Sequence, residues 1–203
     1  IIDNISQVGG NYIKTKKDAP RPGIRVAMAC RKLNLKKNDI VIVVQGDEPL
    51  IHPSMINKTA NFLINNNDYE CTNLIKEANK NEISDPSEIK VVTDKNSNAL
   101  YMSRSPIPSD NHSEIKTKYQ KQVCVLGFTW RFLEKFSFQL RPQPLELHES
   151  IEMLRAIEYG YKIKMLNSNF ESKSVDSDSD RRKVVKIMNK DILYNKYKNE
   201  FKR

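Results

Sequence analysis

Short runs of apolar residues alternate along the chain with segments in which apolar residues recur every three or four positions. The β-branched runs predict strands and the wider spacing predicts amphipathic helices. Strands are expected at residues 11–15, 39–45, 88–94, 99–107, 122–130 and 162–168, and helices at 23–35, 53–66, 144–160 and in the tail 181–203. This alternation favours an α/β class with a mostly parallel sheet, into which 88–94 and 99–107 insert an antiparallel hairpin around the turn "KNSN".

The segment "IVIVVQGDEPLI", residues 40–51, carries the clearest chemical signal. An apolar strand ends there in Gln45, Gly46 and Asp47, and open α/β sheets bind ligands at the carboxyl ends of their strands. Gly46 allows a ligand to approach the backbone, and the Asp47 carboxylate suits Mg²⁺, which clamps phosphate oxygens. The alternative is that Asp47 and Glu48 only cap the next helix.

Composition indicates a globular protein of one domain. The chain has 203 residues, of which 38% are hydrophobic, enough for a sizeable core. No apolar run reaches the length of about 18 residues needed to span a membrane, and the first residues lack the order of a signal peptide, so a cytoplasmic location is expected. Cys30, Cys71 and Cys124 form no Cys-x-x-Cys pair, which favours free thiols over disulfides or a zinc site.

The net charge of +9 is concentrated in the tail 181–203, where the basic residues have helical spacing. A basic C-terminal helix with a solvated face explains this charge better than a nucleic-acid surface, because no aromatic-basic recognition motif is present. We therefore expect neither nucleic acid nor membrane as a partner. A basic nucleic-acid-binding protein remains the alternative.

Four motifs, in this order, carry a family resemblance: "VVQGDEPLI", "IKVVTDKNSNALYMSRSPIP", "RPQPLELHESIEMLRAIEYGYKIK" and "SVDSDSD". They resemble 3-deoxy-manno-octulosonate cytidylyltransferase, the CMP-Kdo synthetase, over nearly the whole chain. The resemblance implies a Rossmann-like nucleotide-diphospho-sugar transferase fold and a homodimer formed through the hairpin-bearing part. It also implies that CTP and a 2-keto-3-deoxy sugar acid give a CMP-sugar and pyrophosphate, with Mg²⁺, for lipopolysaccharide or capsule synthesis.

The resemblance assigns roles to individual residues. It implies that Asp47 and Asp176 are the catalytic metal carboxylates, and that Gln45 and Gly46 approach the sugar. Arg104 of "YMSRSPIP" corresponds to the arginine of the sugar-acid pocket, where a guanidinium fits a carboxylate bidentately. A surface strand arginine is the alternative for Arg104. For Asp176 the alternative is a helix-start acid, but Ser177 can provide that cap and leave Asp176 free for a metal.

Two glutamates of "PLELHES", Glu146 and Glu149, are spaced i,i+3 and share a helix face. From that face they could accept hydrogen bonds from sugar hydroxyls. Alternatively, they are acids that the helix dipole stabilises.

Two regions depart from the family pattern. Gln122 and Phe128 stand where the family has a histidine and a tyrosine that face the sugar. The loop "KKDAPRPGIR" keeps Asp18, Gly23 and Arg25 as expected nucleotide-binding residues but lacks the family's small hydroxyl residues. The substrate is thus left open between Kdo, an amino-substituted Kdo and a nonulosonic acid, and a catalytically silent nucleotide-sugar-binding fragment is the non-enzymatic alternative.

The family begins with a strand and a basic, glycine-containing loop that grips the triphosphate, followed by a helix and a second strand. This chain starts at what resembles the end of the second helix, so we expect it to be N-terminally incomplete. The strand at 39–45 would then have an unpaired apolar edge. Little turnover is expected, because a triphosphate without that loop loses much of its charge stabilisation.

Overall fold

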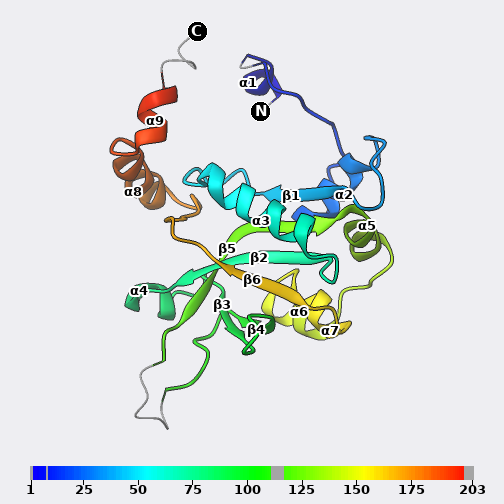
Figure 1. The fold of residues 1–203 in the computed structure, drawn as a ribbon. Helices are drawn as coiled ribbons and strands as arrows, with labels where there is room; N and C mark the ends of the chain where they lie inside the picture. Colours follow the sequence, from blue (N-terminus) through cyan, green and yellow to red (C-terminus); the bar gives the residue numbers. More distant parts are fainter. Residues whose placement is uncertain (1, 8, 111–116, 199–203) are drawn as a thin grey trace.

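A computed structural model describes residues 2–7, 9–110 and 117–198 of the chain. Its six-stranded sheet has the strand order β4-β3-β5-β2-β6, with β1 also paired to β5 (Figure 1). The strands are β1 Ile40–Val44, β2 Cys71–Glu77, β3 Lys90–Thr93, β4 Ala99–Ser103, β5 Gln120–Thr129 and β6 Ile163–Asn167. The helices are α1 Ile2–Gln7, α2 Pro22–Cys30, α3 Pro53–Asn65, α4 Lys80–Ser84, α5 Trp130–Phe138, α6 Pro144–Glu149, α7 Leu154–Glu158, α8 Asp178–Met188 and α9 Ile192–Tyr197.

The α/β class is confirmed, and so is the antiparallel hairpin, formed by β3 and β4. Strands β1, β2, β3 and β6 share one direction, because β1, β2 and β3 all run antiparallel to β5 while β6 runs parallel to β2. Since β5 lies between these strands and opposes them, β2 and β6 are the parallel neighbours in the described sheet. Four of the six strands therefore run in one direction, while β4 and β5 oppose them and the hydrogen-bonded pairs are largely antiparallel.

Strand β5 pairs with both β1 and β3 along one edge, so the sheet divides into two arms on that side. Strand β2 pairs along nearly the whole of β5, whereas β1 pairs with residues 125–129 and β3 with residues 120–121. The β2 ladder has a bulge at Asn73, and the fully buried Asn73 amide donates to Val123 O at 2.8 Å and Val125 O at 3.1 Å. A side chain thus binds main-chain carbonyls beside the point where β1 and β3 separate.

Two apolar layers cover the two faces of the sheet. Helix α3 packs on one face through Met55 against Leu74 and two valines of β5. The larger core on the other face includes residues of α2, α5 and α7, among them Phe132 and Leu154. Figure 1 shows α3 crossing the sheet and α6 and α7 beside the β3–β4 hairpin. Both faces of the sheet are therefore covered by apolar side chains.

Several elements differ from the sequence prediction. Residues 11–15 form no strand, whereas β2 and α5 were not predicted. The predicted helix 144–160 is two helices, because Ser150 adopts a left-handed conformation with φ 55° and ends α6. Leu147 of α6 is 62% exposed, whereas Ile151 and Leu154, which follow the turn, are buried.

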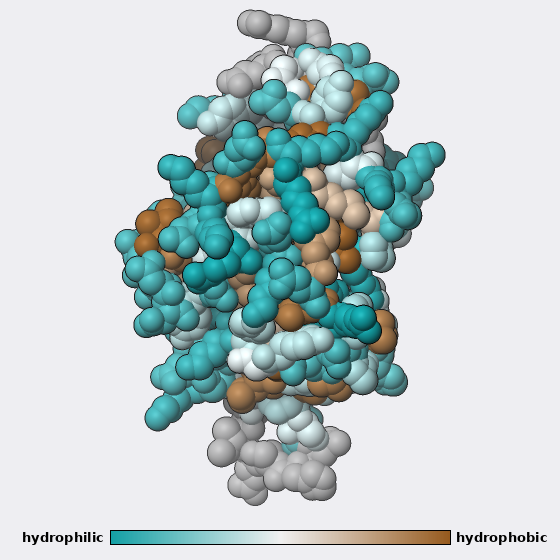
Figure 2. All heavy atoms as spheres, turned by 90° about the vertical axis from the view of Figure 1, so that its right-hand side faces the viewer, coloured by the Kyte–Doolittle hydropathy of each residue, from teal (hydrophilic) through white to brown (hydrophobic). Residues whose placement is uncertain are grey.

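The helices at the two ends of the described chain, α1 and α9, lie beyond β1 in the view of Figure 1. Within the described residues β1 hydrogen-bonds to β5 alone, so its other edge is unpaired, as expected. The basic tail forms α8 and α9, and its last five residues, 199–203, lie outside the described part. The face shown in Figure 2 is mainly hydrophilic, with small scattered apolar groups. None of the described helices has the length and apolar character needed to cross a membrane.

Candidate functional site

A cavity of about 460 Å³ opens where β1 and β3 separate along β5. Its walls come from the start of α2, the end of β1, the loop before β3, residues 150–153 and residues 172–176. Seven of the predicted site residues line it: Gly23, Gln45, Asp47, Arg104, Gln122, Phe128 and Asp176. A second cavity of about 500 Å³ beside α9 contains none of them.

The two predicted metal carboxylates, Asp47 and Asp176, come from distant parts of the chain to the same cavity. A backbone hydrogen bond from Val175 N to Asp47 O, at 2.9 Å, holds the two segments together. Ser174 Oγ donates to Asp176 Oδ2 at 2.8 Å. Helix α8 is capped by Ser177, whose hydroxyl accepts from Asp180 N, so Asp176 is not needed as a cap.

Glu48 makes a second link between these segments. It is 8% exposed, and the Ser172 hydroxyl donates to its carboxylate at 2.5 Å. Burial raises the pKa of Glu48 above its ordinary value, against the effect of the Ser172 hydrogen bond. The segment 172–176 is thus held along the end of β1 at both of its ends.

The carboxylates of the cavity fit a hard cation that takes its remaining ligands from a substrate. No group of three His, Cys, Asp or Glu side chains able to hold a metal occurs in the described part of the chain. Asp47 and Asp176 supply two carboxylates, and the remaining ligands would have to be phosphate oxygens and water. Mg²⁺ is commonly bound in this way, by one or two carboxylates and substrate phosphates.

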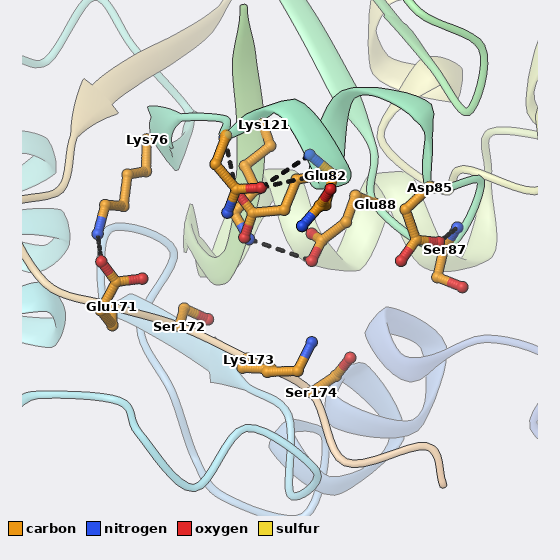
Figure 3. A network of polar contacts seen from close by, with 12 residues as sticks. Lys76, Glu82, Asp85, Ser87, Glu88, Lys121, Glu171, Ser172, Lys173 and Ser174 are labelled. Carbon is orange, nitrogen blue, oxygen red and sulfur yellow. Dashed lines mark hydrogen bonds and ion pairs between the residues drawn. The ribbon is translucent and has the colours of Figure 1, made fainter. Parts of the chain in front are cut away.

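Buried cations fix the loop 85–88, which forms another wall of the cavity. Lys121 donates to Glu82 at 2.7 Å and to Glu88 at 3.1 Å (Figure 3). Burial alone would lower the pKa of Lys121, but the two carboxylates outweigh it and raise the pKa. Beneath the loop, the fully buried Lys90 donates to Asp85 O and Glu88 O at 2.8 and 2.7 Å. Figure 3 shows Lys173 extending from the opposite segment toward this wall.

Arg104 lines the cavity, but its guanidinium is largely committed to main-chain carbonyls. Nε donates to Glu149 O at 2.8 Å and Nη1 to Pro86 O at 2.9 Å, with longer bonds to Ser87 O and Ser150 O, both 3.5 Å. The Arg104 guanidinium therefore has no free pair of N–H groups with which to bind a carboxylate bidentately. Arg104 instead joins the loop before β3 to the end of α6.

The predicted role of Glu146 is corrected by its burial. Glu146 is fully buried, and its two oxygens accept from Arg155 Nε at 2.6 Å and Arg155 Nη2 at 2.5 Å. It is absent from the cavity lining, since the side chain points into the core between α6 and α7. Both oxygens are thus occupied, and none is available to a sugar hydroxyl.

Glu149 likewise lies outside the cavity lining. It accepts from Ser103 Oγ at 2.7 Å, Arg104 N at 2.9 Å and Tyr101 OH at 3.3 Å. Burial would raise the pKa of Glu149, but these hydrogen bonds lower it overall. The residue holds α6 against the hairpin rather than facing a ligand, and the predicted contact with sugar hydroxyls is corrected here too.

The floor of the cavity is contributed by β5. Gln122 Nε2 donates to Asn73 Oδ1 at 2.5 Å, so its amide oxygen and its second N–H are the groups it can offer to a ligand. Phe128 is 2% exposed and packs against Phe132 and Phe136, which makes it mainly a core residue. Burial raises the pKa of the cavity thiol Cys124 to about 12, so it stays protonated at neutral pH and is a poor nucleophile.

The predicted nucleotide-binding residues are only partly brought together. Gly23 lines the cavity, where its N–H donates to Glu152 Oε2 at 3.1 Å. Asp18 and Arg25 are not in the lining, and Arg25 instead binds the loop before α2 through Thr15 Oγ1 at 3.0 Å. Gly46 is also outside the lining, although it lies between two residues that line it.

Glu152 and Arg21 are cavity residues that the sequence analysis missed. Glu152 Oε1 is buried without a hydrogen-bond partner, and burial raises the pKa of this carboxyl. Glu152 packs closely against Gly23. A Cβ atom at position 23 would lie 2.8 Å from Glu152 Oε1, which is too short for an ordinary contact, so glycine suits this position. Glu152 is the third acidic residue of "ELHESIE" and follows Glu149 by three positions. This spacing was the signal in the sequence that could have indicated it.

The comparisons with known proteins show which family the chain resembles. A sequence model of the cytidylyltransferase family matches residues 1–163. The 3-deoxy-manno-octulosonate cytidylyltransferase of Fusobacterium nucleatum is 37% identical over 186 residues, covering 91% of this chain and 74% of the relative. The 8-amino-3,8-dideoxy-manno-octulosonate cytidylyltransferase of Shewanella baltica is 40% identical over 177 residues, covering 86% and 71%.

Two solved structures of CTP-dependent transferases resemble this fold. The structure of a CMP:2-keto-3-deoxy-manno-octonic acid synthetase complexed with CTP superposes with a TM-score of 0.83 at 29% identity, over 92% of this chain and 75% of that chain. The inositol-1-phosphate CTP transferase from T. maritima has a TM-score of 0.61 at 16% identity, over 93% and 70%, which is a likeness of fold. The family match over residues 1–163 and the relatives above show that the chain belongs to the cytidylyltransferase family of nucleotidyltransferases.

Proposed function

We propose that the protein transfers the CMP group of CTP to a 2-keto-3-deoxy sugar acid, Kdo or its 8-amino relative, and releases pyrophosphate. The observation that carries this proposal is the convergence of Asp47 and Asp176 on one cavity, held by the Val175–Asp47 backbone bond. In the reaction, a hydroxyl oxygen of the sugar acid bonds to the α-phosphorus as the bond to the leaving pyrophosphate breaks. The hydroxyl proton is released to water.

Mg²⁺ is the proposed cofactor, and Asp47 and Asp176 are the residues that would hold it. When bound, the ion would neutralise part of the charge of the triphosphate. The contribution of the protein is to position these carboxylates beside Gln45 at the end of β1 and Gln122 on β5. Ser174 donates to Asp176, and the bond from Ser172 to Glu48 holds the segment of Asp176 against that of Asp47. Such preorganisation avoids rearrangement during the reaction.

Turnover and its dependence on the two carboxylates test the proposal. Pyrophosphate release is measured with CTP and a panel of Kdo, 8-amino-3,8-dideoxy-Kdo and a nonulosonic acid, in the presence of Mg²⁺. Asp47→Asn and Asp176→Asn should each abolish Mg²⁺-dependent release. Asp68→Asn is the matched control, because Asp68 is exposed and lies outside the cavity lining. Full activity in either cavity variant would exclude the paired-carboxylate site.

The 8-amino sugar acid is a specific candidate within the panel. The Shewanella baltica relative named for that substrate is 40% identical to this chain, compared with 37% for the Fusobacterium nucleatum relative. The cavity also holds Glu152, whose buried Oε1 has no partner and would accept a hydrogen bond from a hydroxyl or an ammonium group. A kcat/KM for Kdo at least equal to that for the 8-amino acid would decide against the amino substrate.

We also propose a homodimer that forms through the β3–β4 hairpin. An exposed apolar side chain supports this: Leu100 of β4 is 57% exposed. Light scattering after size exclusion should give the mass of two chains, and Leu100→Lys should shift it toward one. A monomer at micromolar concentration would contradict the proposal.

A further inference from the structure

Arg21 is a charged residue of the cavity that lies in the loop "KKDAPRPGIR" but has no role assigned by the family resemblance. It immediately precedes α2 in an extended conformation, with φ −141°, and Pro22 follows it as the first residue of the helix. The start of the helix is held in place by the bond from Gly23 N to Glu152. The side chain of Arg21 is 28% exposed, and it lines the cavity.

Most of the hydrogen-bonding capacity of Arg21 is unused within the described structure. A guanidinium has five N–H donors. Arg21 Nη1 donates to Ser150 Oγ at 2.9 Å, and Nε lies 3.9 Å from Glu146 Oε1, beyond hydrogen-bond distance. Glu146 already has a two-point pair with Arg155, so it provides little compensation for the charge of Arg21.

The other cationic side chains of the cavity have closer partners. Arg104 donates to four main-chain carbonyls, and Lys121 donates to two carboxylates. Lys173 forms an ion pair with Asp180 at 3.6 Å. Arg21 is therefore the guanidinium of the cavity that keeps most of its donors for a ligand, since those of Arg104 are occupied. The Ser150 contact fixes one of its nitrogens and so orients the remaining fork.

We propose that Arg21 binds an oxyanion of a substrate, either the carboxylate of the sugar acid or a phosphate of CTP. The inference rests on the proposed cytidylyltransferase reaction. Carboxylates and phosphates share the geometry that a guanidinium fork recognises with two parallel hydrogen bonds. A lysine ammonium would supply the charge but not the fork.

Steady-state kinetics identify which anion is bound. Arg21→Ala should raise the KM of one substrate about tenfold to a hundredfold, the size expected for the loss of a charge-assisted hydrogen bond. The KM of the other substrate should stay within about twofold, and Arg21→Lys should recover only part of the loss. Arg31→Ala is the matched control, because Arg31 pairs with Glu134 at 3.1 Å on the surface. Unchanged KM values for both substrates in Arg21→Ala would overturn the inference.

A chemical measurement separates this inference from the proposed reaction. Phenylglyoxal modifies free guanidinium groups, and mass spectrometry can follow Arg21, Arg104 and the reference Arg31 in one sample. We expect Arg21 to react faster than Arg104, and CTP or the sugar acid to slow its modification severalfold while Arg31 is unaffected. The simple anions pyrophosphate and pyruvate serve as further probes.

The outcomes of the two measurements are distinct. A protein that releases no pyrophosphate from any acid of the panel refutes the proposed reaction, yet protection of Arg21 by pyrophosphate or pyruvate still supports an anion site. A protein that turns over normally, but whose Arg21 is protected by none of the four ligands, retains its function and refutes the role of Arg21.

Discussion

Replacing Glu146 by alanine should destabilise the protein strongly while leaving substrate affinity intact. The pair it forms is as buried as any in the described chain, with Glu146 0% and Arg155 1% exposed. Arg155 also donates to Phe136 O at 2.9 Å and stacks on the Phe136 ring at 4.5 Å, so it is held in place when its partner is removed. The variant would therefore bury an uncompensated guanidinium.

The expected size of the effect follows from that geometry. Breaking a buried ion pair by removing one partner costs about 3–5 kcal/mol, a large part of the 5–15 kcal/mol typical of a whole protein. For a chain of this length that corresponds to a decrease in Tm of roughly 6–20 °C. Glu146→Gln keeps an acceptor for Arg155 and should lose less. Replacing both partners, as in Glu146→Leu/Arg155→Met, should cost less than Glu146→Ala alone, because neither charge is then left buried.

Urea unfolding of Glu146→Leu, of Arg155→Met and of the double variant, followed by circular dichroism, measures the coupling between the partners. A coupling of at least about 2 kcal/mol is expected from the two short bonds and the complete burial. The KM values of Glu146→Gln for CTP and for the sugar acid should equal those of the wild type. A loss below about 1 kcal/mol in Glu146→Ala, or a raised sugar KM with normal stability in Glu146→Gln, would refute the structural assignment.

Three further variants test other parts of the site. Asn73→Ala removes the donor to two β5 carbonyls and the acceptor for Gln122, so urea unfolding should show a loss of roughly 2–4 kcal/mol; a loss below 1 kcal/mol would mean that water replaces the amide. Burial raises the pKa of Glu152, so its ionisation opposes folding. Glu152→Gln should therefore be more stable than the wild type at pH 8, and this gain should shrink as the pH falls and Glu152 takes up its proton. A difference in stability that stays constant with pH would contradict the assignment. Hydrogen bonds lower the pKa of Glu149 despite its burial, so its carboxylate stabilises the fold above its unfolded pKa of about 4.3. Glu149→Gln should be less stable than the wild type at pH 7, and this difference in stability should disappear below about pH 4. Thermal melts across pH can check it.

The positions of Asp47 and Asp176 could be predicted because their local signals are strong. An apolar strand that ends in Gly and Asp places Asp47 at a sheet edge, and Ser177 is a recognisable cap that leaves Asp176 outside the helix. Both residues line the same cavity, as expected, while their binding of a metal stays a prediction. The contact that joins their segments, from Val175 N to Asp47 O, is a long-range backbone bond with no pattern in the sequence.

The glutamates of "PLELHES" show where periodicity stops being informative. A spacing of i,i+3 predicts a shared face but not whether that face points to a ligand or to the core. The left-handed Ser150 decides the matter by ending α6, after which the chain reverses and Arg155 of α7 meets Glu146. A serine rarely adopts this conformation, and a helical pattern continuing on both sides of it conceals the break.

Strand β2 was missed for a related reason, and its chemistry explains how the site is built. Its Thr72 and Asn73 are fully buried, so the strand lacks the apolar run that predicts an interior strand. Asn73 is polar because the β2–β5 ladder has a bulge there, and bulges are common beside active sites because they redirect side chains. Its amide satisfies two carbonyls of β5, and its oxygen accepts from Gln122. The residue that stabilises the irregular strand therefore also orients a side chain of the cavity, which makes the opening between β1 and β3 a fixed feature of the sheet.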